Sequence, residues 1–216
     1  MPEFIDPNQF IISRKRKKYR FARFHNNPLC FELYEWSARP VDYIEIGAGN
    51  GMFAVEQAAG APERSFVAVD VKGDRLQIGA HAAVARGLTN VYFVRARADQ
   101  IAELVPGHSV GAMWLNFSDP YPKKRSAGRR LTHPYFLNRY AQVLRPGGSL
   151  YIKHDNPQFF SWSLEQLVAS HWSLKELSFD LHDSPLDVSY KIMTAYEQKW
   201  LAQGLPTQFV HATINT

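Results

Sequence analysis

One short block of the sequence combines a single carboxylate with concentrated positive charge. Residues 116–131 read NFSDPYPKKRSAGRRL, in which Asp119 is the only acid and five Lys or Arg side chains follow it within residues 123–130. A carboxylate held in a site can stabilise positive charge that develops during a reaction. Clustered Lys and Arg side chains bind the phosphate groups of a polyanion. The block therefore predicts a site where a polyanion is bound beside a reactive acid.

A second basic segment lies near the N-terminus. Residues 14–23, with the sequence RKRKKYRFAR, contain seven Lys or Arg and no acid. The two segments together hold 12 of the 25 Lys and Arg residues, although the net charge of the chain is only +5. The rest of the chain is acidic, with 13 basic and 20 acidic side chains. This distribution favours a polyanion partner met at defined places, with a solvated tail and a solvated loop as the alternative.

The composition of the whole chain limits the class of protein. A length of 216 residues suits one α/β domain with a modest extension. The only cysteine is Cys30, so an internal disulfide is excluded and a reducing, cytoplasmic setting is favoured. No apolar run approaches the ~20 residues of a membrane span, and the first residues lack a signal-peptide pattern. We therefore expect a cytoplasmic protein without a membrane partner, and no metal, because His25, His133 and His154 lack the spacing of metal ligands.

Apolar stretches alternate with helix-compatible segments through the middle of the chain. The stretches typical of strands are residues 43–46, 65–71, 91–94, 111–117 and 149–153, and the helix-compatible segments are residues 52–60, 74–87, 98–105, 131–144 and 158–170. Strands that alternate with helices form βαβ units, in which helices cover both faces of a parallel sheet. This pattern predicts a doubly wound, Rossmann-like α/β fold.

The two ends of the chain follow different patterns. Residues 172–181 and 191–200 are typical of two further strands with no long helix between them. An antiparallel pair at one edge would complete a seven-stranded, mostly parallel sheet. Residues 1–38 lack clean periodicity and contain the first basic segment. We therefore expect a basic N-terminal arm over residues 1–38, followed by one domain over residues 39–216.

A glycine-rich loop follows the first strand of the predicted sheet. Residues 43–52 read YIEIGAGNGM, so Gly47, Gly49 and Gly51 fall between a strand and a helix. Glycines at such a turn let the backbone bend sharply and let a ligand approach it closely. Asp70 ends the second strand, 19 residues after Gly51. An acid at this place can bind the two hydroxyl groups of a ribose, so the loop predicts a nucleoside site.

The residues around the loop indicate which nucleoside would bind. The dinucleotide fingerprint G-x-G-x-x-G requires a third glycine where this chain has Met52. Glu45 stands two residues before Gly47, and its carboxylate would repel a pyrophosphate. The same carboxylate would suit a cationic ligand that carries an amino group or a sulfonium. These features favour S-adenosylmethionine over a nicotinamide dinucleotide.

Four motifs together resemble one enzyme family. The block NFSDPYPKKR at residues 116–125, followed by RRL at residues 129–131, is similar to the signature of bacterial tRNA (guanine-N7)-methyltransferases of the TrmB type. The glycine loop matches as well, and so do KHD at residues 153–155 and TAYEQKW at residues 194–200. The resemblance implies a class I S-adenosylmethionine-dependent methyltransferase domain. Its expected reaction forms 7-methylguanosine from a variable-loop guanosine of tRNA. We expect the protein to be a monomer or a homodimer.

The resemblance also implies roles for individual residues. Asp119 would be catalytic and close to the cofactor. The other residues expected at the cofactor are Glu45, Gly47, Gly49, Gly51, Asp70 and Asn116, and those expected at the substrate are Lys123, Arg125, Arg129, Arg130, Asp155, Thr194 and Glu197. The chain departs from the family at three places. Tyr121 replaces a usual Trp, and residues 126–128, SAG, replace a stretch that usually contains His. Arg97 stands where an Asp usually contacts the adenine end, with Asp99 two residues further on, and both are expected at the cofactor.

The chemistry of guanine N7 fits a site of this kind. N7 carries a free lone pair, so attack on a sulfonium methyl needs positioning and electrostatics rather than a general base. A carboxylate near the ring would stabilise the cationic product, and a second would accept hydrogen bonds from the N1–H and N2–H₂ edge. Asp119 and Asp155 are the candidates for these two roles, and the sequence leaves open which residue takes which.

Three other functions remain compatible with parts of the sequence. The D-P-Y stretch at residues 119–121 is similar to a motif of enzymes that methylate exocyclic amines of nucleic acid or protein. A nicotinamide oxidoreductase would also use a glycine loop, although Met52 disfavours it. An RNA-binding module with a vestigial cofactor site is indicated only by Arg97.

Overall fold

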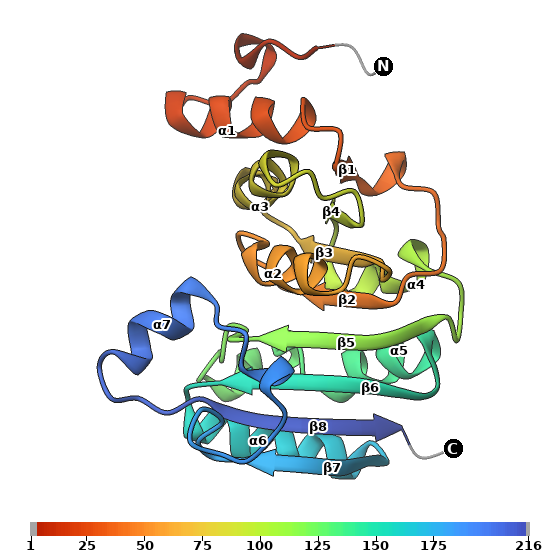
Figure 1. Cartoon of the computed structure of the whole chain (residues 1–216), viewed down its shortest axis with the longest axis vertical. Coiled ribbons are helices and arrows are strands. Elements are labelled where there is room, and N and C mark those ends of the chain that lie inside the picture. Colours follow the sequence, from red (N-terminus) through yellow and green to blue (C-terminus); the bar gives the residue numbers. More distant parts are fainter. Residues whose placement is uncertain (1–3, 215–216) are drawn as a thin grey trace.

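An eight-stranded mixed sheet forms the centre of the molecule, with the strand order β1-β4-β3-β2-β5-β6-β8-β7 (Figure 1). The computed structural model describes residues 4–214. Neighbouring strands from β1 to β6 pair in parallel, whereas β8 is antiparallel to both β6 and β7. The predicted Rossmann-like fold with an antiparallel C-terminal strand pair is confirmed. The strands are β1 (Cys30–Glu32), β2 (Tyr43–Ile46), β3 (Phe66–Asp70), β4 (Val91–Arg95), β5 (Val110–Asn116), β6 (Leu144–His154), β7 (Trp172–Ser178) and β8 (Gln208–Ile214).

Helices cover both faces of this sheet. The α-helices are α1 (Lys15–His25), α2 (Met52–Gly60), α3 (Gly73–Ala85), α4 (Ile101–Leu104), α5 (Pro134–Val143), α6 (Pro157–Ala169) and α7 (Ala195–Leu201). Short 3₁₀ turns occupy Pro7–Gln9, Leu33–Glu35, Ala98–Gln100, Lys124–Arg129 and Val188–Lys191. Within residues 4–214, no helix combines the length and the apolar character that crossing a membrane requires.

The core has two layers because successive residues of the central strands face opposite ways. In β3, Phe66 and Ala68 pack with the layer of α1, α2 and α3, whereas Val67 and Val69 pack with the layer of α4, α5 and α6. All four side chains are buried. Strands covered on both faces are therefore continuously apolar, which is the pattern that made them recognisable in the sequence.

The first strand, β1, was absent from the sequence-based expectation of seven strands. It contains three residues and pairs in parallel with β4, with Cys30 opposite Phe93 and Glu32 opposite Arg95. The Arg95 guanidinium reaches the Glu32 carboxylate at 2.9 Å across the same pair of strands. These contacts join residues about 60 positions apart, so three residues without local periodicity carry no signal for the strand.

The expected strand over residues 191–200 was wrong. This stretch contains the end of a 3₁₀ turn and the helix α7, and the last strand is instead β8. A capping box starts the helix, since Thr194 Oγ1 accepts the Glu197 N–H at 3.0 Å and Glu197 Oε2 accepts the Thr194 N–H at 3.1 Å. The sequence T-x-x-E is the known signature of this motif and marks a helix start.

The basic N-terminal segment forms the helix α1, which is attached to the rest of the structure. Its apolar side chains Phe21, Ala22 and Phe24 are buried. Phe24 lies in the core layer that also contains residues of α2 and α3. Figure 1 shows α1 running beside α3 at one end of the sheet. The Lys and Arg residues of the segment are therefore presented on a helix that a few apolar residues hold in place.

A close approach between α3 and the glycine loop fixes the shape of that loop. The Gly79 N–H donates to the Asn50 carbonyl at 2.8 Å. A Cβ atom at Gly79 would lie 2.7 Å from that carbonyl oxygen and 2.8 Å from the ring of Phe93. Both distances are shorter than van der Waals contact, and the carbonyl is backbone, so the loop itself would have to move.

We predict that Gly79→Ala lowers the free energy of unfolding by about 1–3 kcal/mol, because overpacking forces the helix away from the loop. The measurement is urea denaturation followed by circular dichroism. Gly60→Ala is the matched control, since a Cβ atom at this helical glycine would meet nothing within 4 Å. The control should change stability little or raise it. Equal stability of the two variants would contradict the tight approach of α3.

Candidate active site

A pocket of about 620 Å³ opens at the carboxyl ends of the parallel strands. It lies where β2 has β3 on one side and β5 on the other, so the chain order reverses there. Ligands of open α/β sheets bind at such a switch point. Its walls come from the β2–α2 loop, the end of β3, the start of α3, the loop after β5 and the segment that begins α7.

Asp70 ties the glycine loop to the end of β3. Its Oδ2 accepts the Gly49 N–H at 2.8 Å, and its Oδ1 accepts the Lys72 N–H at 2.8 Å. Gly49 has a φ of 58°, and a Cβ atom there would meet nothing within 4 Å. The glycine is therefore required by the left-handed backbone rather than by crowding, and its bare surface lies at the pocket.

Two buried polar side chains from adjacent strands form the floor of the pocket. The Asn116 amide on β5 donates to Glu45 Oε1 on β2 at 2.9 Å. Among residues 4–214, neither Glu45 Oε2 nor Asn116 Oδ1 has a hydrogen-bond partner. Burial raises the pKa of Glu45 to about 7, although the Asn116 hydrogen bond and the charge of Lys153 act in the opposite direction. The floor therefore offers two unpartnered acceptor oxygens to a cationic or hydrogen-bond-donating ligand.

A strained loop carries Asp119 to the rim of the pocket. Phe117 and Tyr121 have φ values of 48° and 39°, in the left-handed region that non-glycine residues rarely adopt. Each such residue costs on the order of 1–3 kcal/mol and persists only where its surroundings hold it. Asp119 lies between the two strained residues, is exposed and lines the pocket.

His154 holds the first half of this loop from β6. Its Nδ1 accepts the Asn156 N–H at 2.9 Å, so its Nε2 carries the hydrogen and donates to the Ser118 carbonyl at 2.8 Å. Burial lowers the pKa of His154, which favours this neutral form. From the sequence, His154 was considered only as a metal ligand, because no local pattern marks its role. The structure shows a buried side chain that positions the loop beside Asp119.

Arg130 holds the second half of the loop. Its guanidinium donates to the Pro120 carbonyl at 3.0 Å through Nε and to the Tyr121 carbonyl at 3.0 Å through Nη2. The same group lies over the Trp162 ring of α6, 4.3 Å from its centroid. Charged hydrogen bonds and a cation–π contact therefore fasten the loop to the body of the protein.

Known proteins of similar sequence share one activity in their names. A sequence profile described as "Putative methyltransferase" matches residues 39–209. A tRNA (guanine-N(7)-)-methyltransferase of Brevibacillus brevis is 36% identical over 189 residues, covering 85% of this chain and 87% of that protein. One of Lachnoclostridium phytofermentans is 33% identical and covers 94% of this chain and 90% of its own. The chain belongs to the tRNA (guanine-N7)-methyltransferase family.

Solved structures of rRNA methyltransferases share the fold at low sequence identity. The 16S rRNA methyltransferase KamB superposes with a TM-score of 0.60 at 19% identity, covering 85% of this chain and 90% of that chain. The 16S rRNA (adenine(1408)-N(1))-methyltransferase of Catenulisporales acidiphilia superposes with a TM-score of 0.57 at 16% identity, covering 98% and 94%. This chain therefore shares its fold with these rRNA methyltransferases.

The pocket brings together eight of the residues expected from the family motifs. Its lining includes Glu45, Gly47, Gly49, Asp70, Asn116, Asp119, Arg129 and Thr194. Gly51 lies behind the loop, where a Cβ atom would be 2.5 Å from the Phe93 ring. Lys123 and Arg125 are exposed around the 3₁₀ turn beside the rim. Arg130 instead faces the loop carbonyls, and Asp155 lies behind the lining, where it accepts a hydrogen bond from the lining residue Tyr196.

The departure from the family at Arg97 leads to an internal ion pair. The Arg97 Nη2 atom lies 2.8 Å from Asp99 Oδ2, and the Arg97 side chain is 66% exposed. The guanidinium holds the pKa of Asp99 below its usual range. Ala98, between the two, lines the pocket. Ala98, rather than either charged side chain, therefore borders the pocket at this turn.

Several lining residues were not identified as pocket residues from the sequence. Arg20 of α1 lines the pocket, although the sequence placed it in a basic arm for a polyanion. Arg75 and Ile78 of α3 also line it, and no local signal marks them. Tyr196 lines the opposite wall, and its hydroxyl donates to Asp155 Oδ2 at 3.2 Å. Tyr196 lies within the T-x-Y-E motif, which is the signal that could have found it.

The described part of the chain contains no group of three or more His, Cys, Asp or Glu side chains placed to hold a metal ion. The polar groups at the pocket are instead isolated carboxylates, amides and guanidinium groups from different elements.

We predict that Arg130→Ala lowers the free energy of unfolding by about 2 kcal/mol, because the loop carbonyls lose a charged donor. The neighbouring Arg129 is exposed, so Arg129→Ala is the matched control and should change stability by less than about 0.5 kcal/mol. Chemical denaturation of the purified variants measures both. The assignment of Arg130 to the loop fails if the two variants are equally stable.

Proposed function

We propose that this protein transfers the methyl group of S-adenosylmethionine to N7 of a guanosine in the variable loop of tRNA, forming 7-methylguanosine. The observation that carries the proposal is the position of Asp119. Its carboxylate is exposed at the rim of a pocket with a carboxylate–amide floor, and basic residues 123–130 follow it directly. In this arrangement the acid of the motif acts on the guanine, and the basic residues of the same motif bind the tRNA backbone.

The residues of the pocket fit S-adenosylmethionine. The unpartnered oxygens of Glu45 and Asn116 suit the ammonium group of its amino-acid end. Asp70 has lone pairs left for ribose hydroxyls after accepting from two backbone N–H groups. When bound, the cofactor supplies a methyl group on a cationic sulfur. The protein supplies a buried carboxylate, the bare backbone at Gly49 and a pocket of adequate size.

The protein then needs only to position the guanine and stabilise its charge. N7 has a free lone pair, and no proton has to be removed before attack. We assign Asp119 to the positive charge that develops on the purine, because it lies at the rim of the same pocket as Glu45. Asp155, held by the Tyr196 hydroxyl, is left to accept hydrogen bonds from the N1–H and N2–H₂ edge.

The basic residues serve the tRNA backbone in this proposal. Lys123, Arg125 and Arg129 lie around the rim, and the charged face of α1 lies beyond it. Arg20 joins the two regions, because it lines both the main pocket and a second hollow formed by Lys15, Arg16, Tyr19 and Arg23. Helix α1 would thus act as an RNA-binding extension of the methyltransferase domain, whose sheet also includes β1 from within residues 1–38.

Nucleoside analysis tests the reaction directly. Unmodified tRNA incubated with enzyme and S-adenosylmethionine should yield 7-methylguanosine after digestion and mass spectrometry. Asp119→Asn should reduce turnover about 10²–10³-fold, because it removes charge that matters most in the transition state. Glu165→Gln, at an exposed acid of α6 that is absent from the pocket lining, is the matched control. Methyl groups on an exocyclic nitrogen would establish the alternative reaction, and untouched tRNA would refute both.

The raised pKa of Glu45 predicts that cofactor affinity depends on pH. A cationic ligand requires the ionised carboxylate, and a pKa of about 7 leaves much of the group protonated in slightly acidic solution. The dissociation constant of S-adenosylmethionine should therefore be about tenfold larger at pH 6 than at pH 8. Titration calorimetry at several pH values measures it.

Glu45→Gln is the control for this pH dependence. The variant should bind the cofactor more weakly at pH 8 and with little dependence on pH, because it has no carboxyl group to ionise at this place. A wild-type affinity that is constant between pH 6 and pH 8 would contradict the role of Glu45. Absence of saturable binding would favour an RNA-binding module with a vestigial cofactor site.

A further inference from the structure

The helix α7 is attached to the sheet mainly by a carboxylate rather than by an apolar face. Glu197 is fully buried, whereas Tyr196, Gln198 and Lys199 are exposed and Trp200 and Leu201 are half-buried. Short helices of globular proteins are normally held by a buried apolar stripe. Among the described side chains of α7, the most deeply buried one is therefore an acid.

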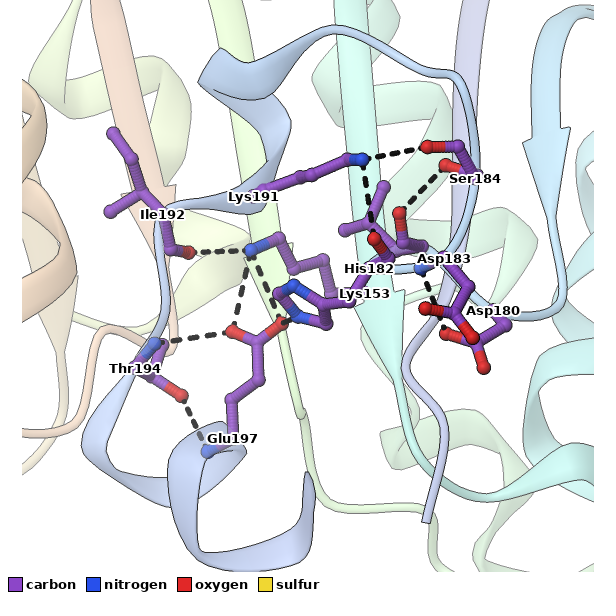
Figure 2. Close-up of polar contacts among 10 residues, drawn as sticks. Lys153, Asp180, His182, Asp183, Ser184, Lys191, Ile192, Thr194 and Glu197 are labelled. Atoms are coloured by element: carbon purple, nitrogen blue, oxygen red, sulfur yellow. Dashed lines mark hydrogen bonds and ion pairs between the residues drawn. The ribbon is translucent and has the colours of Figure 1, made fainter. Parts of the chain in front are cut away.

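Lys153 of β6 is the partner of this acid. Its side chain has no exposed surface, and its Nζ lies 3.3 Å from Glu197 Oε2 and 3.5 Å from Oε1. Nζ also donates to the Ile192 carbonyl at 2.6 Å. Burial lowers the pKa of Lys153, and the charge of Glu197 opposes this effect. Figure 2 shows the ammonium group of Lys153 between Glu197 and Ile192. Ile192 belongs to the segment that leads into α7.

The remaining contacts occupy both carboxylate oxygens of Glu197. Its Oε1 lies 2.8 Å from His182 Nε2, and its Oε2 accepts the Thr194 N–H at 3.1 Å. Every one of these partners belongs to the protein (Figure 2). Glu197 is absent from the pocket lining, although Thr194 and Tyr196 on the same segment are part of it. A buried, fully occupied carboxylate cannot also receive a substrate without breaking these contacts.

The position of α7 decides the shape of one wall of the pocket. Tyr196 contacts Phe117 of the Asp119 loop, with ring centroids 5.2 Å apart, and its hydroxyl donates to Asp155. Figure 1 shows α7 at the end of the sheet where β5 and β6 finish. Loss of the buried ion pair would therefore remove Thr194 and Tyr196 from the pocket together.

We propose that Lys153 and Glu197 are positioning residues whose buried ion pair docks α7 over the pocket and so forms its guanosine side. Neither side chain touches the substrate. The effect on turnover rests on the proposed tRNA reaction, whereas the docking of α7 does not. Breaking one partner of a buried pair leaves an uncompensated charge, while an apolar pair of similar volume can replace both partners.

The test compares Lys153→Met, Glu197→Met and the double variant by hydrogen–deuterium exchange and by turnover of tRNA. Each single variant should show faster amide exchange in α7, with β6 and β8 still protected, and a loss of kcat/KM of about a hundredfold. The double variant should regain part of both α7 protection and turnover relative to the single variants, because two methionines replace the buried charges, whereas the Ile192 carbonyl and the Thr194 N–H still lack their partners. A direct substrate contact by Glu197 would leave the double variant as inactive as Glu197→Met.

Lys199→Met is the matched control, because it removes an exposed lysine from the same helix and should leave α7 protection unchanged. Across all variants, turnover must follow α7 protection. An inactive variant with α7 protected as in the wild type overturns the proposal, and so does a fully active variant with α7 exchanging freely. Unchanged α7 exchange in Lys153→Met overturns it as well. These exchange results stand even if tRNA proves not to be the substrate, so the two proposals fail separately.

Discussion

The hydrogen bond between Glu45 and Asn116 is the constraint around which the site is arranged. It joins β2 to β5 at the point where the order of strands reverses, and it places an acid where water is excluded. A buried carboxylate with an unpartnered oxygen is costly for the folded chain. That cost is understandable in a binding site, because a cationic ligand can satisfy the oxygen at the moment of binding. The glycine loop, Asp70 and the Asp119 loop surround this single pair of side chains.

Opposite charges are separated by depth in this molecule. The carboxylates lie at the floor and the rim of the pocket, whereas the Lys and Arg residues of α1 and of residues 123–130 lie around it. The strained backbone at Phe117 and Tyr121 permits this separation, because it turns Asp119 toward the pocket while the basic residues continue outward. His154 and Arg130 hold the turn from two sides through backbone carbonyls. Both side chains thus support the site without having to touch a ligand.

Sequence reasoning was accurate where the structure depends on local patterns. The apolar runs of β2 to β6 and the glycine loop gave the fold and the pocket, because strands buried on both faces and left-handed glycines have strong local signatures. Sequence reasoning failed where contacts between residues that are distant in the sequence determine the structure. β1 exists through its pairing with β4, and the burial of Glu197 depends on Lys153, which lies 44 residues away in the sequence. The T-x-x-E capping signal of α7 was present, but the strand-like residues 191–193 concealed it.

The position of β8 has a consequence for how this chain is made. β8 lies between β6 and β7, so until residues 208–214 arrive β6 is paired on one side only, with β5, and β7 has no hydrogen-bonded neighbour. During synthesis the nascent chain therefore carries two open strand edges, which can pair with other chains. The segment with α7 is also produced before β8, so its docking partner on β6 belongs to an incomplete sheet. A ribosome that stops before residue 208 releases a polypeptide with every helix of the described structure but with an unfinished sheet.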